Sequence, residues 1–247
     1  MPEQNKPFLL IDVGNSFIKA AVYQNDICLQ KSSFLPGEEK ALLTVFSKMS
    51  FHSIMMLASG QSNLHKSLQE FDANTPVHQL HFGLVKSINW SYEMPETIGI
   101  DRIAAWLGAQ TMYERKNICV VQLGTCMTID CLENGQYHLG GIISPGLNMR
   151  FRSMHEFTAK LPLSSENEVF GKMGNSTLSC LASGVLYGMV AEIEYQFEAF
   201  KDLVGGDPLL VLTGGGVNNL AHRLKPSNFV APDLVFLGML KVLKSLI

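Results

Sequence analysis

The sequence lacks the short motifs that mark several large enzyme classes. It contains no GxxxxGKS/T segment, which excludes a P-loop kinase, and no GxSxG segment, which excludes the nucleophile elbow of a hydrolase. No HExxH zinc motif occurs, because His155-Glu156 has no second histidine. The pair His78-x-x-His81 has no companion cysteine or carboxylate cluster, so we interpret both as ordinary surface or strand histidines.

Cysteine, charge and long apolar runs are also scarce. The five cysteines are odd in number and form no CxxC pair, so we expect free thiols in a reducing compartment. Charged residues make up 17% of the chain and the net charge is −3, without a basic cluster; we therefore expect no nucleic acid partner. No apolar run approaches the roughly 18 residues of a membrane helix, and residues 1–7 are too polar for a signal peptide. Together these absences predict a cytoplasmic protein without a membrane partner.

The most informative feature that is present is a pair of similar segments, residues 9–16 and 119–126. Each is an apolar run that ends in a polar residue, one spacer, a glycine and a small polar side chain. This pattern predicts a buried strand followed by a sharp turn. Free backbone N–H groups at such a turn suit a polyphosphate, so we predict two turns that hold a nucleotide between two domains. The polar residue differs in chemistry between the copies, because the amide of Gln122 stands where the first copy has the carboxylate of Asp12.

Strand and helix patterns alternate in both halves, which predicts an α/β fold. A boundary near residues 114–118 divides the chain into domains 1–115 and 116–247. On the longest predicted helix, Gly184-x-x-x-Gly188 indicates close helix packing, within the chain or at a subunit interface. We expect strands at 8–13, 18–22, 53–58, 119–124, 128–132, 137–143 and 209–212, helices at 40–49, 101–113 and 178–200, and an irregular segment at 83–100.

The first turn combines Asp12, Gly14 and Asn15 at a strand end, where open α/β sheets place ligands. Asp12 could act on Mg²⁺ through its water shell, Asn15 could bind phosphate oxygens, and Lys19 could neutralise phosphate charge. An ordinary hairpin turn with a solvated lysine is the alternative, since Asp, Gly and Asn all favour turns.

The second turn offers the hydroxyl and backbone amide of Thr125, followed by Thr128 and Asp130 on the next strand. Each threonine could equally be structural. Two further glycine-dense loops, 140–146 and 213–216, indicate either a ligand or a tight turn.

Asp101 and Arg102 follow Gly99 at the start of a predicted helix. A helix-capping aspartate is one interpretation. The other is a catalytic base that accepts a proton from an attacking hydroxyl, with Arg102 binding a carboxylate or phosphate in bidentate fashion.

Taken in order, these motifs resemble those of the type III pantothenate kinases. The resemblance covers nearly the whole chain, through residues 12–19, 92–102, 124–130, 140–146, 158–162, Thr177 and 213–215. It implies the fold of the acetate and sugar kinase, heat-shock chaperone and actin superfamily. That fold has two ribonuclease-H-like (actin-like ATPase) domains with a nucleotide cleft between them, usually in a homodimer.

The resemblance also implies an activity and a site. The γ-phosphoryl group of ATP would pass, with Mg²⁺, to the 4′-hydroxyl of pantothenate, the first step of coenzyme A biosynthesis. Asp101 would be the catalytic proton acceptor, and Asp12 would also act on Mg²⁺ through water. ATP would bind at Asp12, Val13, Gly14, Asn15, Ser16, Phe17, Ile18, Lys19 and Thr125, and pantothenate at Tyr92, Gly99, Ile100, Asp101, Arg102 and Thr177.

Gln122 departs from the family pattern, which has an aspartate at this position as the ligand of a monovalent cation, K⁺ or NH₄⁺. An amide oxygen can coordinate K⁺ but supplies no negative charge. Since hard-cation affinity depends on ligand charge, we predict a weakened or absent K⁺ site.

Two other functions stay open on the sequence. A kinase for another small hydroxyl acceptor would keep the ATP side, but Tyr92 and residues 99–102 belong to the pantothenate side. A non-catalytic regulatory member would be favoured by loss of Asp12 or Asp101, and both are present. The missing carboxylate at Gln122 keeps that interpretation open.

Overall fold

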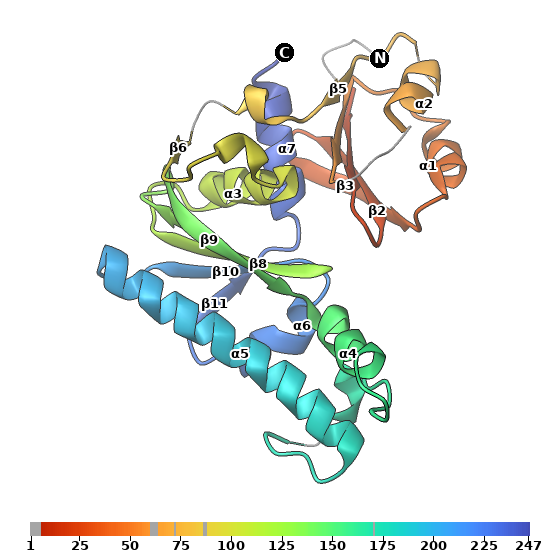
Figure 1. The fold of residues 1–247 in the computed structure, drawn as a ribbon. Coiled ribbons are helices and arrows are strands. Elements are labelled where there is room, and N and C mark those ends of the chain that lie inside the picture. The colour runs from red at the N-terminus through yellow and green to blue at the C-terminus, as the bar shows by residue number, and fades with distance from the viewer. Residues whose placement is uncertain (1–5, 60–63, 72, 86–87, 170) are drawn as a thin grey trace. The chain divides into compact units, whose positions relative to one another are not determined.

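The computed structural model describes residues 6–59, 64–71, 73–85, 88–169 and 171–247, which divide into two compact units (Figure 1). Unit 1 comprises Met1–Ser87, Met94–Thr111 and Leu234–Ile247, and unit 2 comprises Ile88–Glu93 and Met112–Asp233. The sequence predicts one boundary near residue 115, whereas the chain crosses between the units more than once. The reason is that a short strand before the boundary pairs with the sheet of unit 2, and the last helix packs on the sheet of unit 1.

Unit 1 is built on a five-stranded sheet in the order β3-β2-β1-β4-β5. The strands are β1 (Phe8–Val13), β2 (Ile18–Gln24), β3 (Ile27–Phe34), β4 (Ser53–Ala58) and β5 (Val77–Gln79), and the helices are α1 (Glu39–Phe46), α2 (Leu64–Phe71), α3 (Ile100–Met112) and α7 (Leu234–Lys244). On one face, Leu9 and Ile11 of β1 join the buried cluster formed with α1 and α2. On the other face, α7 contacts β1 and β4, and α3 crosses α7 (Figure 1).

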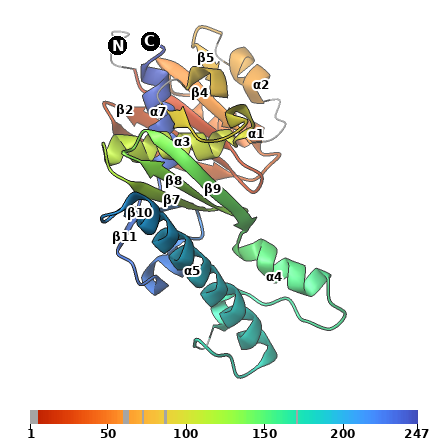
Figure 2. The same ribbon diagram turned by 60° about the vertical axis from the view of Figure 1, so that its left-hand side comes forward.

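Unit 2 is built on a six-stranded sheet in the order β11-β10-β7-β8-β9-β6. The strands are β6 (Asn89–Trp90), β7 (Ile118–Leu123), β8 (Cys126–Glu133), β9 (Tyr137–Pro145), β10 (Leu209–Thr213) and β11 (Asn228–Val230), and the helices are α4 (Leu147–Glu156), α5 (Thr177–Val204) and α6 (Val217–Leu220). Both α4 and α5 contact β8 and lie on the same face of the sheet (Figure 2). The long helix α5 begins at a capping box in which the Ser176 and Ser179 side chains bond each other's backbone N–H groups.

The two sheets repeat one plan. In each, an antiparallel meander (β1–β2–β3 or β7–β8–β9) precedes two strands parallel to its first member (β4 and β5, or β10 and β11). Asp12 and Gln122 are both the last residue but one of the first strand, paired with Lys19 and Thr128 respectively. The predicted α/β fold is therefore confirmed, and the two similar segments occupy equivalent positions.

Within the chain, close helix packing occurs at α3 and α7 and not at the predicted glycine pair, for which packing at a subunit interface stays a prediction. Apart from the helix's own backbone, no described atom lies within 4 Å of a Cβ built on Gly184 or Gly188. In contrast, a Cβ on Gly108 would lie 2.0 Å from the carbonyl oxygen of Leu234, and one on Gly238 would lie 1.8 Å from that of Ala104. The two helices thus meet backbone to backbone, which only glycine allows.

Among the described helices, none combines the length and apolar character that crossing a bilayer requires.

We expect Gly238→Ala to lower the free energy of unfolding by about 1–3 kcal/mol or more, because the added methyl must push α7 off α3. Gly188→Ala is the matched control: its methyl meets no described atom of the same chain beyond the helix's own backbone, and alanine in a helix gains about 0.5–1 kcal/mol over glycine. Urea denaturation followed by the fluorescence of the buried Trp106 measures both changes. Equal midpoints for the two variants would contradict this account of the α3–α7 crossing.

Candidate active site

In unit 1, the end of β1 presents a carboxylate opposite a lysine. Asp12 pairs with Lys19 of β2, and both project from the face opposite to Ile11 and Ile18, which lie in the core beneath α1 and α2. Burial raises the pKa of Asp12 from its ordinary value of 3.8 to about 6, against the lowering effect of Lys19. The negative charge of Asp101 makes a smaller contribution to the raised pKa of Asp12, so these two predicted carboxylates interact electrostatically.

The turn after β1, for which phosphate binding stays a prediction, is closed by a backbone hydrogen bond. The backbone N–H of Gly14 donates to the carbonyl oxygen of Phe17 at 3.0 Å, which closes the turn. Asn15, Ser16 and Phe17 are exposed at its tip. Their side chains are accessible to a ligand, while Val13 and Ile18 anchor the flanking strands.

Asp101 lies in the first turn of α3, which begins one residue earlier than predicted, at Ile100. Its Oδ1 atom would lie 2.7 Å from a Cβ built on Gly99, so the carboxylate occupies the space that any other residue at position 99 would fill. The positive end of the helix dipole favours the ionised carboxylate at this place. Gly99 therefore leaves room for Asp101 at the helix start.

Arg102 has a different setting from the one that its sequence position suggested. Its side chain is buried, and the guanidinium carbon lies 5.9 Å from the centre of the Trp106 ring, one turn further along α3. This cation–π contact fixes the side chain against its own helix. Contact between Arg102 and a substrate carboxylate stays a prediction.

In unit 2, the turn after β7 is shorter than the first but is also closed by the N–H of its glycine. The N–H of Gly124 donates to the carbonyl oxygen of Cys126 at 3.0 Å, and Thr125 is exposed at its tip. The N–H of Gly146, at the end of β9, donates to the carbonyl oxygen of Thr125 at 3.1 Å, and a Cβ on Gly146 would lie 2.3 Å from the same oxygen. The glycine-dense loop after β9 thus packs directly against the second turn.

The last glycine loop closes on the same turn from β10. A Cβ on Gly214, whose φ is +98°, would lie 2.4 Å from the carbonyl oxygen of Leu123, which also accepts the N–H of Gly216 at 3.1 Å. Three loops, after β7, β9 and β10, therefore meet with their backbones in contact. The sequence pointed to each loop separately but not to this convergence.

A row of polar side chains crosses the same sheet below the turn. Gln122 pairs with Thr128 on β8 and with Thr213 on β10, on the face opposite α5. Gln122 Oε1 and Thr128 Oγ1 are buried and lack a hydrogen-bond partner among the described residues. Both are neutral oxygens, and the described ranges contain no group of three or more His, Cys, Asp or Glu residues that could hold a metal.

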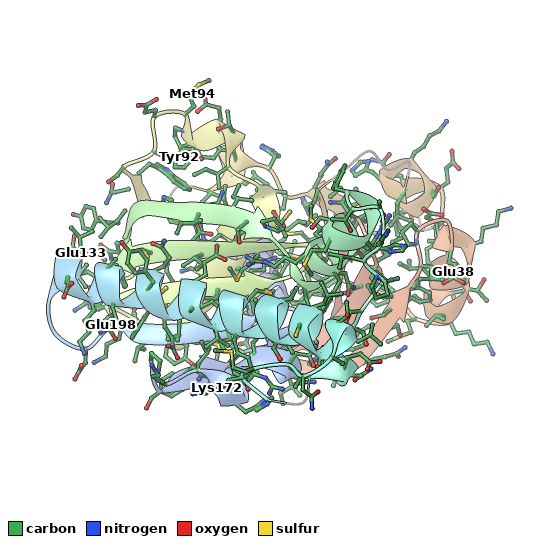
Figure 3. The ribbon with its side chains drawn as sticks, turned by 60° about the horizontal axis from the view of Figure 1, so that its bottom comes forward. Glu38, Tyr92, Met94, Glu133, Lys172 and Glu198 are labelled. Carbon is green, nitrogen blue, oxygen red and sulfur yellow. The ribbon has the colours of Figure 1, made fainter. Side chains whose placement is uncertain are left out.

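The predicted acceptor residues of unit 2 are not all brought together. Tyr92, which Figure 3 labels, follows the edge strand β6, and its ring centre lies 6.1 Å from that of His138. Thr177 is the first residue of α5, and Figure 1 shows the start of this helix and β6 at opposite ends of unit 2. Within one chain, Thr177 therefore lies far from Tyr92.

Residues 8–199 match the family "Type III pantothenate kinase". Over 222 residues the chain is 33% identical to the type III pantothenate kinase of Flavobacterium johnsoniae, which covers 90% of this chain and 91% of that relative. Acetate kinase from Entamoeba histolytica superposes with a TM-score of 0.56 at 11% identity, over 97% of this chain and 99% of that one. A Campylobacter jejuni protein, assigned by name to a Baf family of transcriptional activators, superposes with a TM-score of 0.60 at 22% identity, over 96% and 98% of the two chains.

The two solved structures are too distant in sequence to show more than the fold, which is the two-domain fold of the acetate and sugar kinases. The family match spans most of the chain, and the relative is similar over nearly its whole length. The chain therefore belongs to the type III pantothenate kinase family.

Proposed function

We propose that this protein transfers the γ-phosphoryl group of ATP to the 4′-hydroxyl of pantothenate, the first step of coenzyme A biosynthesis. The family membership supports the reaction. The observation that supports activity in this chain is that Asp12 and Asp101 are both present and act electrostatically on each other in unit 1. A regulatory member without catalysis would have no need to keep two carboxylates in this arrangement.

In the proposed mechanism, Asp101 accepts the proton of the pantothenate hydroxyl as it attacks the γ-phosphorus. This carboxylate lies at the N-terminal end of α3, where the helix dipole attracts negative charge, and Gly99 leaves the space in which it lies. Mg²⁺ bound to ATP would neutralise phosphate charge, with Asp12 acting on its water shell and Lys19 adding a positive charge. Catalysis is then mainly positioning and charge neutralisation of an in-line transfer.

We assign residues 12–19 and Thr125 to ATP, and Tyr92 with residues 99–102 and Thr177 to pantothenate. The matching turns of the two sheets support the first assignment, because each presents an exposed polar tip after a buried strand. For the second, the distance between Thr177 and Tyr92 in one chain favours a homodimer in which the partner supplies Thr177. We place the protein in the cytoplasm, where its substrates are made and used.

We propose that the monovalent cation contributes little. The oxygens of Gln122 and Thr128 could accept K⁺, but without a carboxylate they fit the expected site poorly, and no step of the mechanism passes through it. Replacing K⁺ by choline should therefore change the turnover rate by less than about twofold, whereas the Gln122→Asp variant should gain a severalfold dependence on K⁺. A large rise in the rate of the parent protein on adding K⁺ to a cation-free assay would refute this proposal.

A coupled assay of ADP release tests the proposed reaction against the two alternatives. With Mg-ATP, we expect saturable turnover with pantothenate and none with a sugar or acetate as acceptor. Turnover with another acceptor in place of pantothenate would identify a different small-molecule kinase. No turnover with any acceptor would favour the regulatory interpretation and contradict the proposal.

A further inference from the structure

A buried acid–histidine pair on unit 2 has no part in the mechanism above. His138 Nε2 lies 3.0 Å from Asp130 Oδ1, and the two residues are 0% and 1% exposed. Replacing such a buried pair with apolar residues often leaves a protein equally stable or more stable. Stability alone therefore does not explain why Asp130 and His138 occupy the sheet at this place.

The pair depends on an irregularity in β9. Asp130 pairs with Gly141 and Cys131 with Gly140, but Leu132 pairs with His138, so one residue of β9 has no partner on β8. Without this bulge His138 would stand opposite Glu133, on the other face of the sheet from Asp130, because a one-residue shift reverses side-chain direction. The bulge turns His138 to the face of Asp130.

A left-handed glycine accompanies the bulge. Gly140 has φ +121°, a conformation that other residues rarely adopt. The sequence singled out this glycine only as part of a dense loop. In the structure Gly140 is next to the bulged position of β9. Its backbone conformation allows the bulge that turns the His138 side chain towards Asp130.

His138 in turn supports the segment that carries Tyr92. Trp90 of β6 pairs with His138 of β9, and the N–H of Ser91 donates to the carbonyl oxygen of His138 at 3.0 Å. The ring centres of Trp90 and Tyr92 both lie 6.1 Å from that of the histidine. Tyr92 lies across the sheet from α5, as Figure 3 shows. The backbone just before Tyr92 and the Tyr92 ring thus both contact His138.

We propose that Asp130 and His138 are positioning residues for the acceptor substrate: Asp130 orients the imidazole, and the imidazole holds Tyr92 where pantothenate contacts it. This inference rests on the proposed function for the assignment of Tyr92 to pantothenate. Neither residue touches the reacting atoms. Their loss should therefore weaken the use of pantothenate and leave ATP binding and the chemical step nearly unchanged.

Kinetics of His138→Ala, Tyr92→Ala and the double variant test the proposal. We expect each single change to raise the KM for pantothenate about tenfold, with the KM for ATP and kcat within about threefold of the parent values. The double variant should be no worse than Tyr92→Ala, because His138 acts through Tyr92. A purely structural role of His138 would instead multiply the two effects.

Two further variants complete the experiment, one as a control and one as a substitute for His138→Ala. Ser183 lies on α5, and its hydroxyl donates to the carbonyl oxygen of Gly171; Ser183→Ala removes this hydrogen bond and should leave the KM for pantothenate unchanged. His138→Gln keeps an amide donor for Asp130 but loses the ring, and it replaces His138→Ala in the cycle if the alanine variant does not fold. Activity of the parent with multiplied effects in the double variant would overturn this inference alone. No parental activity with pantothenate would overturn the proposed function, and the inference with it.

Discussion

Replacing Asp101 with asparagine should lower kcat for pantothenate phosphorylation by about 10²–10⁴-fold. Asparagine has nearly the same shape as aspartate, so it fits the space above Gly99, but it cannot accept the proton of the attacking hydroxyl. Because the change leaves the ATP side intact, the KM for ATP should stay within about twofold of the parent value. Initial rates at saturating ATP and pantothenate measure the effect.

Glu96→Gln is a suitable control for Asp101→Asn. Glu96 is an exposed carboxylate in the short 3-10 helix Pro95–Thr97, just before α3, and its neutralisation removes the same charge from the same region. We expect nearly parental kinetics for this variant. An Asp101→Asn protein that keeps more than about a tenth of the parental kcat would show that another group accepts the proton.

Replacing Asp12 with asparagine should make the protein inactive and more stable at once. Loss of the carboxylate removes the group that acts on Mg²⁺, so we expect kcat/KM for ATP to fall by about 10²-fold or more. Burial of the charged carboxylate is unfavourable in the folded state, as its pKa of about 6 indicates. After allowance for the solvent access of this half-buried side chain, asparagine should raise the free energy of unfolding by about 1–2 kcal/mol at pH 8.

The increase in the free energy of unfolding that we expect for Asp12→Asn should depend on pH. The folded-state pKa of Asp12 lies above its ordinary value of 3.8, so the folded protein holds this proton more tightly than the unfolded chain does. The protonated Asp12 carboxyl group stabilises the folded parent protein. This stabilisation is fully present below pH 3.8 and is lost as the pH rises through about 6. The Asp12→Asn variant does not share the loss, so its advantage should grow from pH 4 to pH 7 and then level off. Thermal unfolding in Mg²⁺-free buffers measures it, and a variant less stable than the parent at pH 8 would contradict a costly buried charge.

The strands and turns of the site were predictable because they are local in sequence. Apolar runs that end in glycine identified β1 and β7, and both turns close as expected. The strand β4 and the long helix α5 also matched their predicted positions to within a few residues. Hydrophobic periodicity is sufficient for such segments because each buries one continuous apolar surface.

Features that depend on distant parts of the chain were not predictable in this way. The helix α7 was missed, and its partner α3 precedes it by more than a hundred residues. The strand β3 was missed because none of its residues is buried: the apolar Ile27 and Leu29 fall on the exposed positions, so no apolar face marks the strand. The bulge in β9 needs the register of β8 against β9, which no property of residues 137–145 alone contains. For the same reason, nothing in the sequence pointed to His138.

The repeated sheet plan explains why the single change at Gln122 matters. Asp12 and Gln122 stand at equivalent positions of equivalent strands, with Lys19 and Thr128 as their cross-strand neighbours. Unit 1 therefore offers a charged pair where unit 2 offers two neutral oxygens. We infer that the cation chemistry of this protein is concentrated at the Asp12 turn.

The most direct test of the account is identification of the product by mass spectrometry. Purified protein, Mg-ATP and pantothenate should yield phosphorylated pantothenate and ADP in equal amounts, and the Asp101→Asn variant should yield neither above background. Consumption of ATP without phosphorylated pantothenate, or an intact mixture after prolonged incubation with the parent protein, would contradict it.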